Sequence, residues 1–72
     1  MKLNNENGLI ALVTLLINKH EAETFPIDHG TQYVSKSGLV CNIYNTKTVL
    51  IQNEKSDFDL ANDIRTLIDM WN

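Results

Sequence analysis

The chain of 72 residues has few cysteines, prolines, glycines and basic residues. Its single cysteine, Cys41, excludes an internal disulfide and fits a reducing cytosol. Six Lys and Arg stand against nine Asp and Glu, so the formal net charge is −3 and there is no broad basic field for binding nucleic acid. No linker-like or low-complexity stretch divides the chain, and we expect residues 1–72 to form one domain. A domain of this size has little room for a deep enzyme cleft.

Long hydrophobic runs are also absent. The longest, Gly8–Ile17, is far shorter than the ~20 apolar residues that cross a bilayer. It does not resemble a signal peptide either, because Glu6 offsets Lys2 and no small-residue cleavage site follows. We therefore expect a soluble cytoplasmic protein with no membrane attachment.

The clearest structural signal is the alternating pattern from Gly38 to Asn53, which predicts two β-strands. A two-residue turn between them would scatter the apolar side chains over both faces. A three-residue turn, Asn45–Lys47, collects them on one face: Leu39, Cys41, Ile43, Val49 and Ile51. We therefore predict the longer turn, with Lys47 in the left-handed conformation, at a cost of roughly 1 kcal/mol relative to glycine.

The preceding segment is less well determined. Thr31–Ser35 is predicted to be a strand that ends at the turn Lys36–Gly38. A two-residue turn would place Val34 opposite Cys41, and a three-residue turn would place Tyr33 there, so the register stays open. Glu21–Gly30 contains Pro26 and is expected to be a loop, with Phe25 or Ile27 beneath the sheet.

Segments with helical periodicity precede and follow the predicted strands. A first helix is expected from about Gly8 to His20, capped by Asn5 or Asn7, after frayed residues 1–5. Leu15 would lie on its solvent side, either as a singly exposed leucine or as a contact with a partner. A second helix begins after the Ser56 cap, and its Arg65 would pair with Asp69.

The predicted fold is therefore α+β: a helix, a three-stranded antiparallel β-meander and a helix. Both amphipathic helices must bury their apolar sides on one face of the sheet, which leaves the other face open. That open face mixes apolar and hydrogen-bonding side chains, as a binding surface does: Val40, Asn42, Tyr44, Thr48, Leu50 and Gln52.

The segment Cys41–Asn53 resembles a motif in the TATA-binding-protein-like (TBP-like) domain at the N-terminus of ribonuclease HIII, and similar segments occur in other small bacterial domains of that fold. The resemblance implies a curved antiparallel sheet with helices on its convex side, a role in holding an RNA/DNA hybrid, and no catalytic residue. The sheet-face positions that it carries over are Asn42, Tyr44, Thr48, Leu50 and Gln52. A TATA-binding sheet has two halves, and dimerisation would supply the second.

Residue patterns that would indicate catalysis are missing. There is no phosphate-binding glycine loop, no Cys-x-x-Cys pair and no Gly-x-Ser-x-Gly motif. His20 and His29 lie near acidic residues, but their spacing matches no established metal site. We expect no metal, no cofactor and no enzyme activity.

The leading hypothesis is a small non-catalytic interaction module, such as an adaptor, an antitoxin-like protein or a bacterial or phage mobile-element inhibitor. It would bind a protein partner through the open sheet face or through Leu15 of the first helix. The alternative is nucleic-acid binding through the same face, with Tyr44 stacking on a base and with Lys36 and Lys47 contacting phosphates. A self-associating protein is the third hypothesis.

Overall fold

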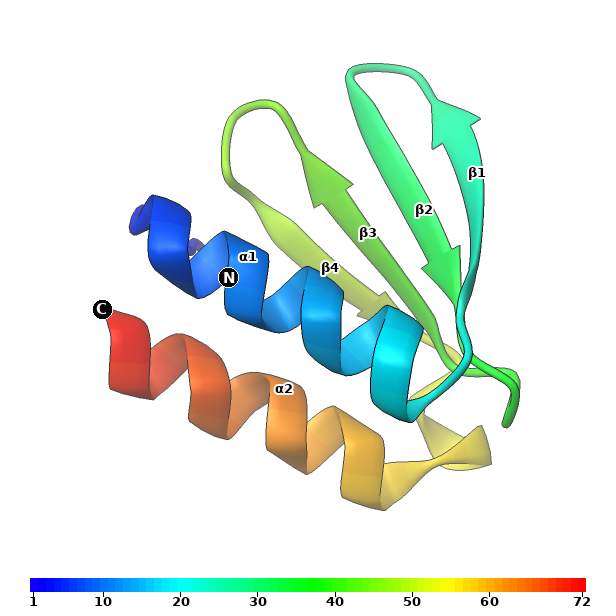
Figure 1. Ribbon diagram of the computed structural model, residues 1–72. Helices are drawn as coiled ribbons and strands as arrows, with labels where there is room; N and C mark the ends of the chain where they lie inside the picture. Colours follow the sequence, from blue (N-terminus) through cyan, green and yellow to red (C-terminus); the bar gives the residue numbers. More distant parts are fainter.

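The computed structural model describes all 72 residues as an α+β fold (Figure 1). Helix α1 (Glu6–Thr14) continues into a π-helical turn, η1 (Leu15–Lys19). Four strands follow: β1 (Glu23–Ile27), β2 (Gly30–Val34), β3 (Val40–Tyr44) and β4 (Val49–Gln52). A 3-10 turn, η2 (Glu54–Ser56), leads into the closing helix α2 (Phe58–Trp71).

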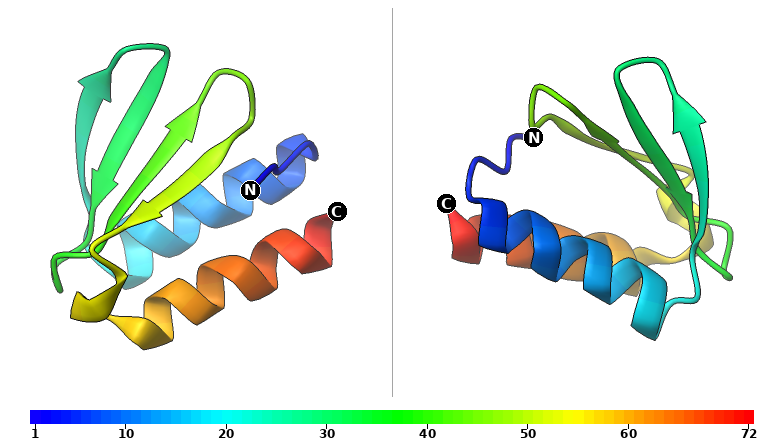
Figure 2. Two further views of the ribbon diagram at one scale, coloured as in Figure 1. Left: turned by 180° about the vertical axis from the view of Figure 1, so that it is seen from behind. Right: turned by 45° about the horizontal axis from the view of Figure 1, so that its top comes forward.

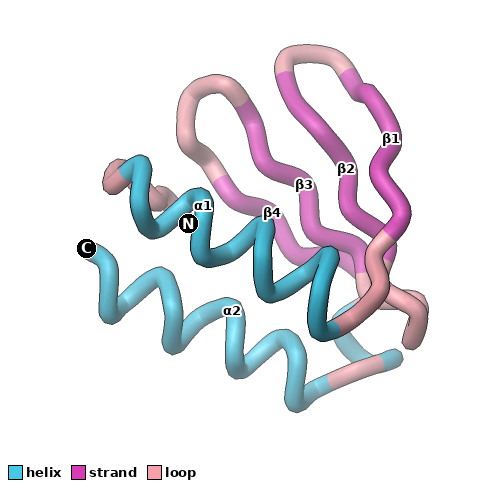
Figure 3. The backbone as a smooth tube through the Cα atoms, viewed as in Figure 1, coloured by secondary structure: helices cyan, strands magenta, loops and turns pink.

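The elements form two layers. The sheet is antiparallel with the order β1-β2-β3-β4, and both helices lie on one of its faces (Figures 1 and 2). The helices run antiparallel to each other in one layer (Figure 3). Gly8 permits their close approach, because a Cβ atom at that position would lie 2.7 Å from Cβ of Trp71. The other face of the sheet has no covering element.

The predicted hairpin of β3 and β4 is confirmed. Ile43 pairs with Val49 and Cys41 pairs with Ile51, as the three-residue turn requires. Lys47 has a φ of 69°, so it takes the left-handed conformation expected at the last turn position. The open register of β2 is also resolved, since Tyr33 lies opposite Cys41 on the face that meets the helices.

The prediction of three strands and a loop over Glu21–Gly30 is wrong. Residues 23–27 form β1, which pairs with β2 around a turn at Asp28 and His29. Pro26 was read as a loop signal, but β1 is an edge strand, where a residue without an N–H is tolerated. Phe25 pairs with Gln32, so it lies on the open face and not beneath the sheet.

The first helix is rotated relative to the predicted orientation. Leu12 and Leu16 are fully buried, whereas Ile10 and Ile17, which the helical period places on the same broad arc, are exposed. Leu15 is half-buried and packs against the core, so the prediction that it lies on the solvent side is wrong. From Leu9 to Ile17 every residue except Thr14 is apolar, and the packing against the sheet therefore decides which side is buried.

The N-terminal residues are ordered, contrary to the expectation that they fray. The N–H of Leu3 donates to the Lys47 carbonyl, and the N–H of Val49 donates to the Met1 carbonyl, which extends the sheet beside β4. Leu3 is fully buried. It joins the core formed between the sheet and the helices: Leu3, Leu12, Leu16, Leu39, Cys41, Val49, Leu60, Ala61, Ile64 and Ile68.

Helix caps are only partly as predicted. Asn5 caps α1 by accepting hydrogen bonds from the N–H groups of Asn7 and Gly8. The cap of α2 is Asp57, which accepts from the N–H of Leu60, and not Ser56. Ser56 instead donates to the Asn53 carbonyl within η2.

Candidate interaction surface

The open face of the sheet is a continuous row of side chains across all four strands. Directly paired residues point to the same side of a sheet, so Phe25, Gln32, Asn42 and Leu50 form one row across it. Phe25 and Leu50 stand at the two edges of this row, and each is 43% exposed. The face therefore presents one large apolar side chain at each edge and amide groups between them.

Asn42 lies at the centre of the row, on the face where it was predicted, but it is only 4% exposed. Its Nδ2 group lies 3.5 Å from the Tyr44 hydroxyl, and its Oδ1 atom is buried without a hydrogen-bond partner. The tyrosine hydroxyl can donate or accept, so whichever way the amide is turned, one of its two ends is unpaired. An unpaired buried amide group destabilises a fold by roughly 1–3 kcal/mol.

The other predicted face residues lie where the register puts them. Val40 pairs with Gln52, and Tyr44 and Thr48 are joined by a hydrogen bond at the end of the hairpin. Strands β1 and β2 add further members that the sequence reasoning missed: Glu23, Phe25, Ile27, Gln32 and Val34. The alternation Phe25-Pro26-Ile27 before Asp28-His29-Gly30 was the available signal, and the proline concealed it.

Charge is nearly absent from this face. Among the residues that alternate onto it, only Glu23 of β1 and Lys2, which pairs with Thr48 beside β4, have charged side chains. The two lysines expected to contact phosphates lie in the turns at opposite ends of β3. Lys36 pairs with Glu21 at 3.1 Å, and Lys47 Nζ donates to the Asn4 carbonyl at 3.3 Å. Both lysines thus have partners within the chain.

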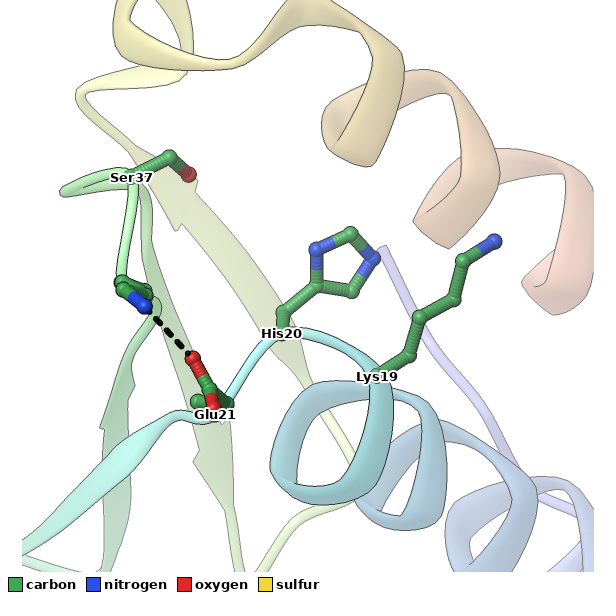
Figure 4. A pocket seen from close by; sticks show the side chains of 5 residues that line it. Lys19, His20, Glu21 and Ser37 are labelled. Carbon is green, nitrogen blue, oxygen red and sulfur yellow. Dashed lines mark ion pairs between the residues drawn. The ribbon is translucent and has the colours of Figure 1, made fainter.

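A separate polar pocket lies at the end of the first helix. It has a volume of about 300 Å³ and is lined by Lys19, His20, Glu21, Lys36 and Ser37, with no apolar side chain (Figure 4). The Lys36 N–H donates to the His20 carbonyl, which holds the β2–β3 turn against the helix end. The imidazole of His20 lies between Lys19 and Ser37.

Ser37 and Asp57 next to this pocket have the residue types of a catalytic triad but not its hydrogen bonds. The Ser37 hydroxyl donates directly to the Asp57 carboxylate at 2.7 Å, and that carboxylate also caps α2. The bond from Ser37 and the Leu60 N–H, with a smaller attraction from His20, lower the pKa of Asp57. No hydrogen bond joins Ser37 to His20, so this arrangement caps a helix and does not activate a nucleophile.

Other reactive residues do not form a site. No three His, Cys, Asp or Glu side chains come together in positions that could hold a metal ion. Cys41 is fully buried, and burial raises the pKa of its thiol to about 12. Such a thiol is a small core side chain and not a nucleophile.

Comparisons of the chain with protein-family models, curated proteins and solved structures gave no match. Neither helix is long and apolar enough to cross a lipid bilayer. The physical properties of the surface are therefore the basis for a functional proposal.

Proposed function

We propose that this protein is a small non-catalytic module that binds another protein through the open face of its sheet. The observation that carries the proposal is the central row, in which exposed Phe25 and Leu50 flank the buried, unpaired amide of Asn42. Apolar side chains around an unpaired polar group match the composition of protein interfaces, in which an apolar centre includes a few hydrogen bonds. The buried single cysteine fits action in the cytoplasm.

The edges of the sheet are unfavourable for the addition of a strand, which supports a partner that docks on the open face. Pro26 removes a backbone donor from the β1 edge, which weakens the hydrogen-bond ladder that an added strand would need. Residues Met1–Leu3 already pair with the start of β4. A partner would therefore contact side chains of the open face.

The charge and size of the face favour a protein surface that is close to neutral. The charged residues of this face are Glu23 and Lys2, and the Lys2 ammonium already donates to the Thr46 carbonyl, so the face offers little positive charge to a phosphate backbone. Four strands spaced about 4.8 Å apart make the face roughly 19 Å wide, and five residues of about 3.3 Å each make it roughly 17 Å long. Its area is therefore about 300 Å². This is below the ~800 Å² per partner that stable complexes bury, so a complex through this face alone would be of the weak, transient class.

The four-stranded antiparallel sheet with both helices on one face supports a relationship to TBP-like domains, as the Cys41–Asn53 resemblance implies. In such a domain the uncovered face is the one that meets the ligand. We therefore propose that the TBP-like sheet has been retained here with a face that suits a protein.

Paired surface variants test the proposal. Leu50→Glu and Phe25→Glu place a charge on the open face. Ile10→Glu is the control, because it places a charge on an aliphatic residue of the helix layer that is 65% exposed. After nuclease treatment, we expect the wild type and Ile10→Glu to retain bound partner proteins that both face variants have lost. Retention of every partner by Leu50→Glu would overturn the proposal.

A nuclear magnetic resonance titration with a short RNA/DNA hybrid separates the two ligand classes. The expected result is no change in the amide shifts of Asn42, Tyr44 and Gln52 at low salt. Shifts there that shrink as salt rises would replace the protein partner by a nucleic acid.

A further inference from the structure

The polar pocket at the end of the first helix is a second, chemically different site. It lies between Lys19–Glu21 and the turn that holds Lys36 and Ser37 (Figure 4). Because no apolar side chain lines it, a ligand could gain little from burying apolar surface there. The pocket is suited to a small polar group, and its volume of about 300 Å³ is at the low end for ligand sites.

Two basic side chains line this pocket, together with the carboxylate of Glu21. Lys19 and Lys36 both line it, and they are two of only six basic residues in a chain of net charge −3. His20 adds an imidazole whose Nε2 atom is buried without a hydrogen-bond partner. These three donors come from two segments that are far apart in the sequence.

The negative groups around the pocket are already compensated or easily displaced. The Asp57 carboxylate accepts from the Ser37 hydroxyl and from the Leu60 N–H. Glu21 pairs with Lys36, but the two side chains are 65% and 80% exposed, and ion pairs of this kind contribute little to stability. An anion with two charges can therefore compete with the Glu21 carboxylate for Lys36.

Two of the carbonyl groups at the helix end accept hydrogen bonds. A helix C-terminus normally repels anions because its last carbonyl groups are unpaired. Here the Ala22 N–H donates to the Leu16 carbonyl, and the Lys36 N–H donates to the His20 carbonyl, each at 3.0 Å. These bonds reduce the local negative potential and fix the two walls of the pocket relative to each other.

We propose that this pocket binds the dianionic phosphate group of a phosphate monoester through Lys19, His20 and Lys36. Lysine binds phosphate as a compact point charge, which suits an open pocket of this kind. The phosphate group itself is what the pocket recognises, because no hydrophobic residue lines the pocket to hold the rest of the molecule.

The test is a titration of ¹⁵N-labelled protein with inorganic phosphate at pH 7, against sodium chloride at matched ionic strength. Saturable shifts are expected at Lys19–Glu21, Lys36 and Ser37 with phosphate and not with chloride. Lys36→Ala and Lys19→Ala should each weaken binding about fivefold, the factor expected for one charge contact in high dielectric. Lys2→Ala is the matched control, because Lys2 Nζ bonds to Thr46 at the other end of β3.

Glu21→Gln gives the sharpest result. It removes the carboxylate that competes for Lys36, so it should strengthen phosphate binding, whereas a purely structural ion pair would give no gain. Phosphoserine and adenosine monophosphate should bind as inorganic phosphate does if the phosphate alone is recognised, and tighter binding of one of them would identify the source. Equal shifts with chloride, or equal loss in Lys2→Ala and Lys36→Ala, would overturn the proposal.

Discussion

Arg65 of α2 forms a two-pronged ion pair with Glu54, eleven residues earlier, and both N–O distances are 2.9 Å. The expected partner, Asp69, lies one helical turn away but is not used. The hydrogen bonds from Arg65, followed by its charge, lower the pKa of Glu54. This pair ties the 3-10 turn after β4 to the middle of the helix that covers the sheet.

Glu54 should therefore make stability depend on pH. A carboxyl group whose pKa is lowered by folding stabilises the fold above its ordinary value of 4.5, and that contribution is lost as pH falls through the folded pKa. Glu54→Gln should have a lower urea midpoint than the wild type at pH 7, and the difference should shrink at pH 3. Arg65→Lys keeps the charge without the paired geometry and should fall between them. An unchanged difference at pH 3 would contradict this assignment.

Leu3→Ala tests whether the N-terminal segment belongs to the core. Leu3 is fully buried, and removing a buried leucine side chain typically costs about 2–5 kcal/mol. In a domain whose core supplies only ~3–5 kcal/mol, this variant should be largely unfolded in circular dichroism at 25 °C. Asn4→Ala, at the exposed neighbouring position, should unfold as the wild type does. A folded Leu3→Ala protein would show that the segment is dispensable.

Lys47→Gly should stabilise the β3–β4 hairpin. Lys47 has a φ of 69°, in the left-handed region where a Cβ atom is unfavourable. Glycine should raise the free energy of unfolding by about 1 kcal/mol, less any contribution from the Lys47 bond to Asn4. Thr46→Gly is the control, because Thr46 does not have a positive φ and should lose stability. Urea midpoints of the two variants should thus move in opposite directions.

Asn42→Leu should stabilise the isolated protein, because it removes an amide that is buried with one end unpaired. The expected gain is about 1 kcal/mol in urea unfolding. Tyr44→Phe removes only a long contact and should change stability little. If Asn42→Leu destabilises the protein instead, the amide is satisfied in solution and the argument for a partner at this point fails.

Cys41 should be inert in the folded protein. Burial raises the pKa of its thiol to about 12, so only about one thiol in 10⁴ is ionised at pH 8. Reaction with a thiol reagent should be limited by unfolding and should become fast in urea. Rapid reaction in buffer, at a rate independent of stability, would show that the thiol is accessible.

Much of the β-hairpin was determined by the sequence alone. Alternation of apolar residues around Asn45–Lys47 favours one register, because a shift by one residue would turn every apolar side chain to the other face. The existence of both helices, and a cap of the first at Asn5 or Asn7, likewise follow from local patterns, and the structure selects Asn5. The uncovered sheet face follows from these, since two apolar helix sides need the same covering surface.

Tertiary structure decided the features that depend on residues far apart in the chain. Pro26 is compatible with a strand only because β1 lies at an edge, and nothing in the local sequence shows which strand is outermost. The side of α1 that is buried was set by packing, because apolar residues lie almost all around it. Asn42 is covered only by neighbours on paired strands, and Arg65 found a better partner in Glu54 than in Asp69. Local patterns fix both helices and the β3–β4 hairpin, whereas contacts between distant segments fix β1 and decide which side chains are left for function.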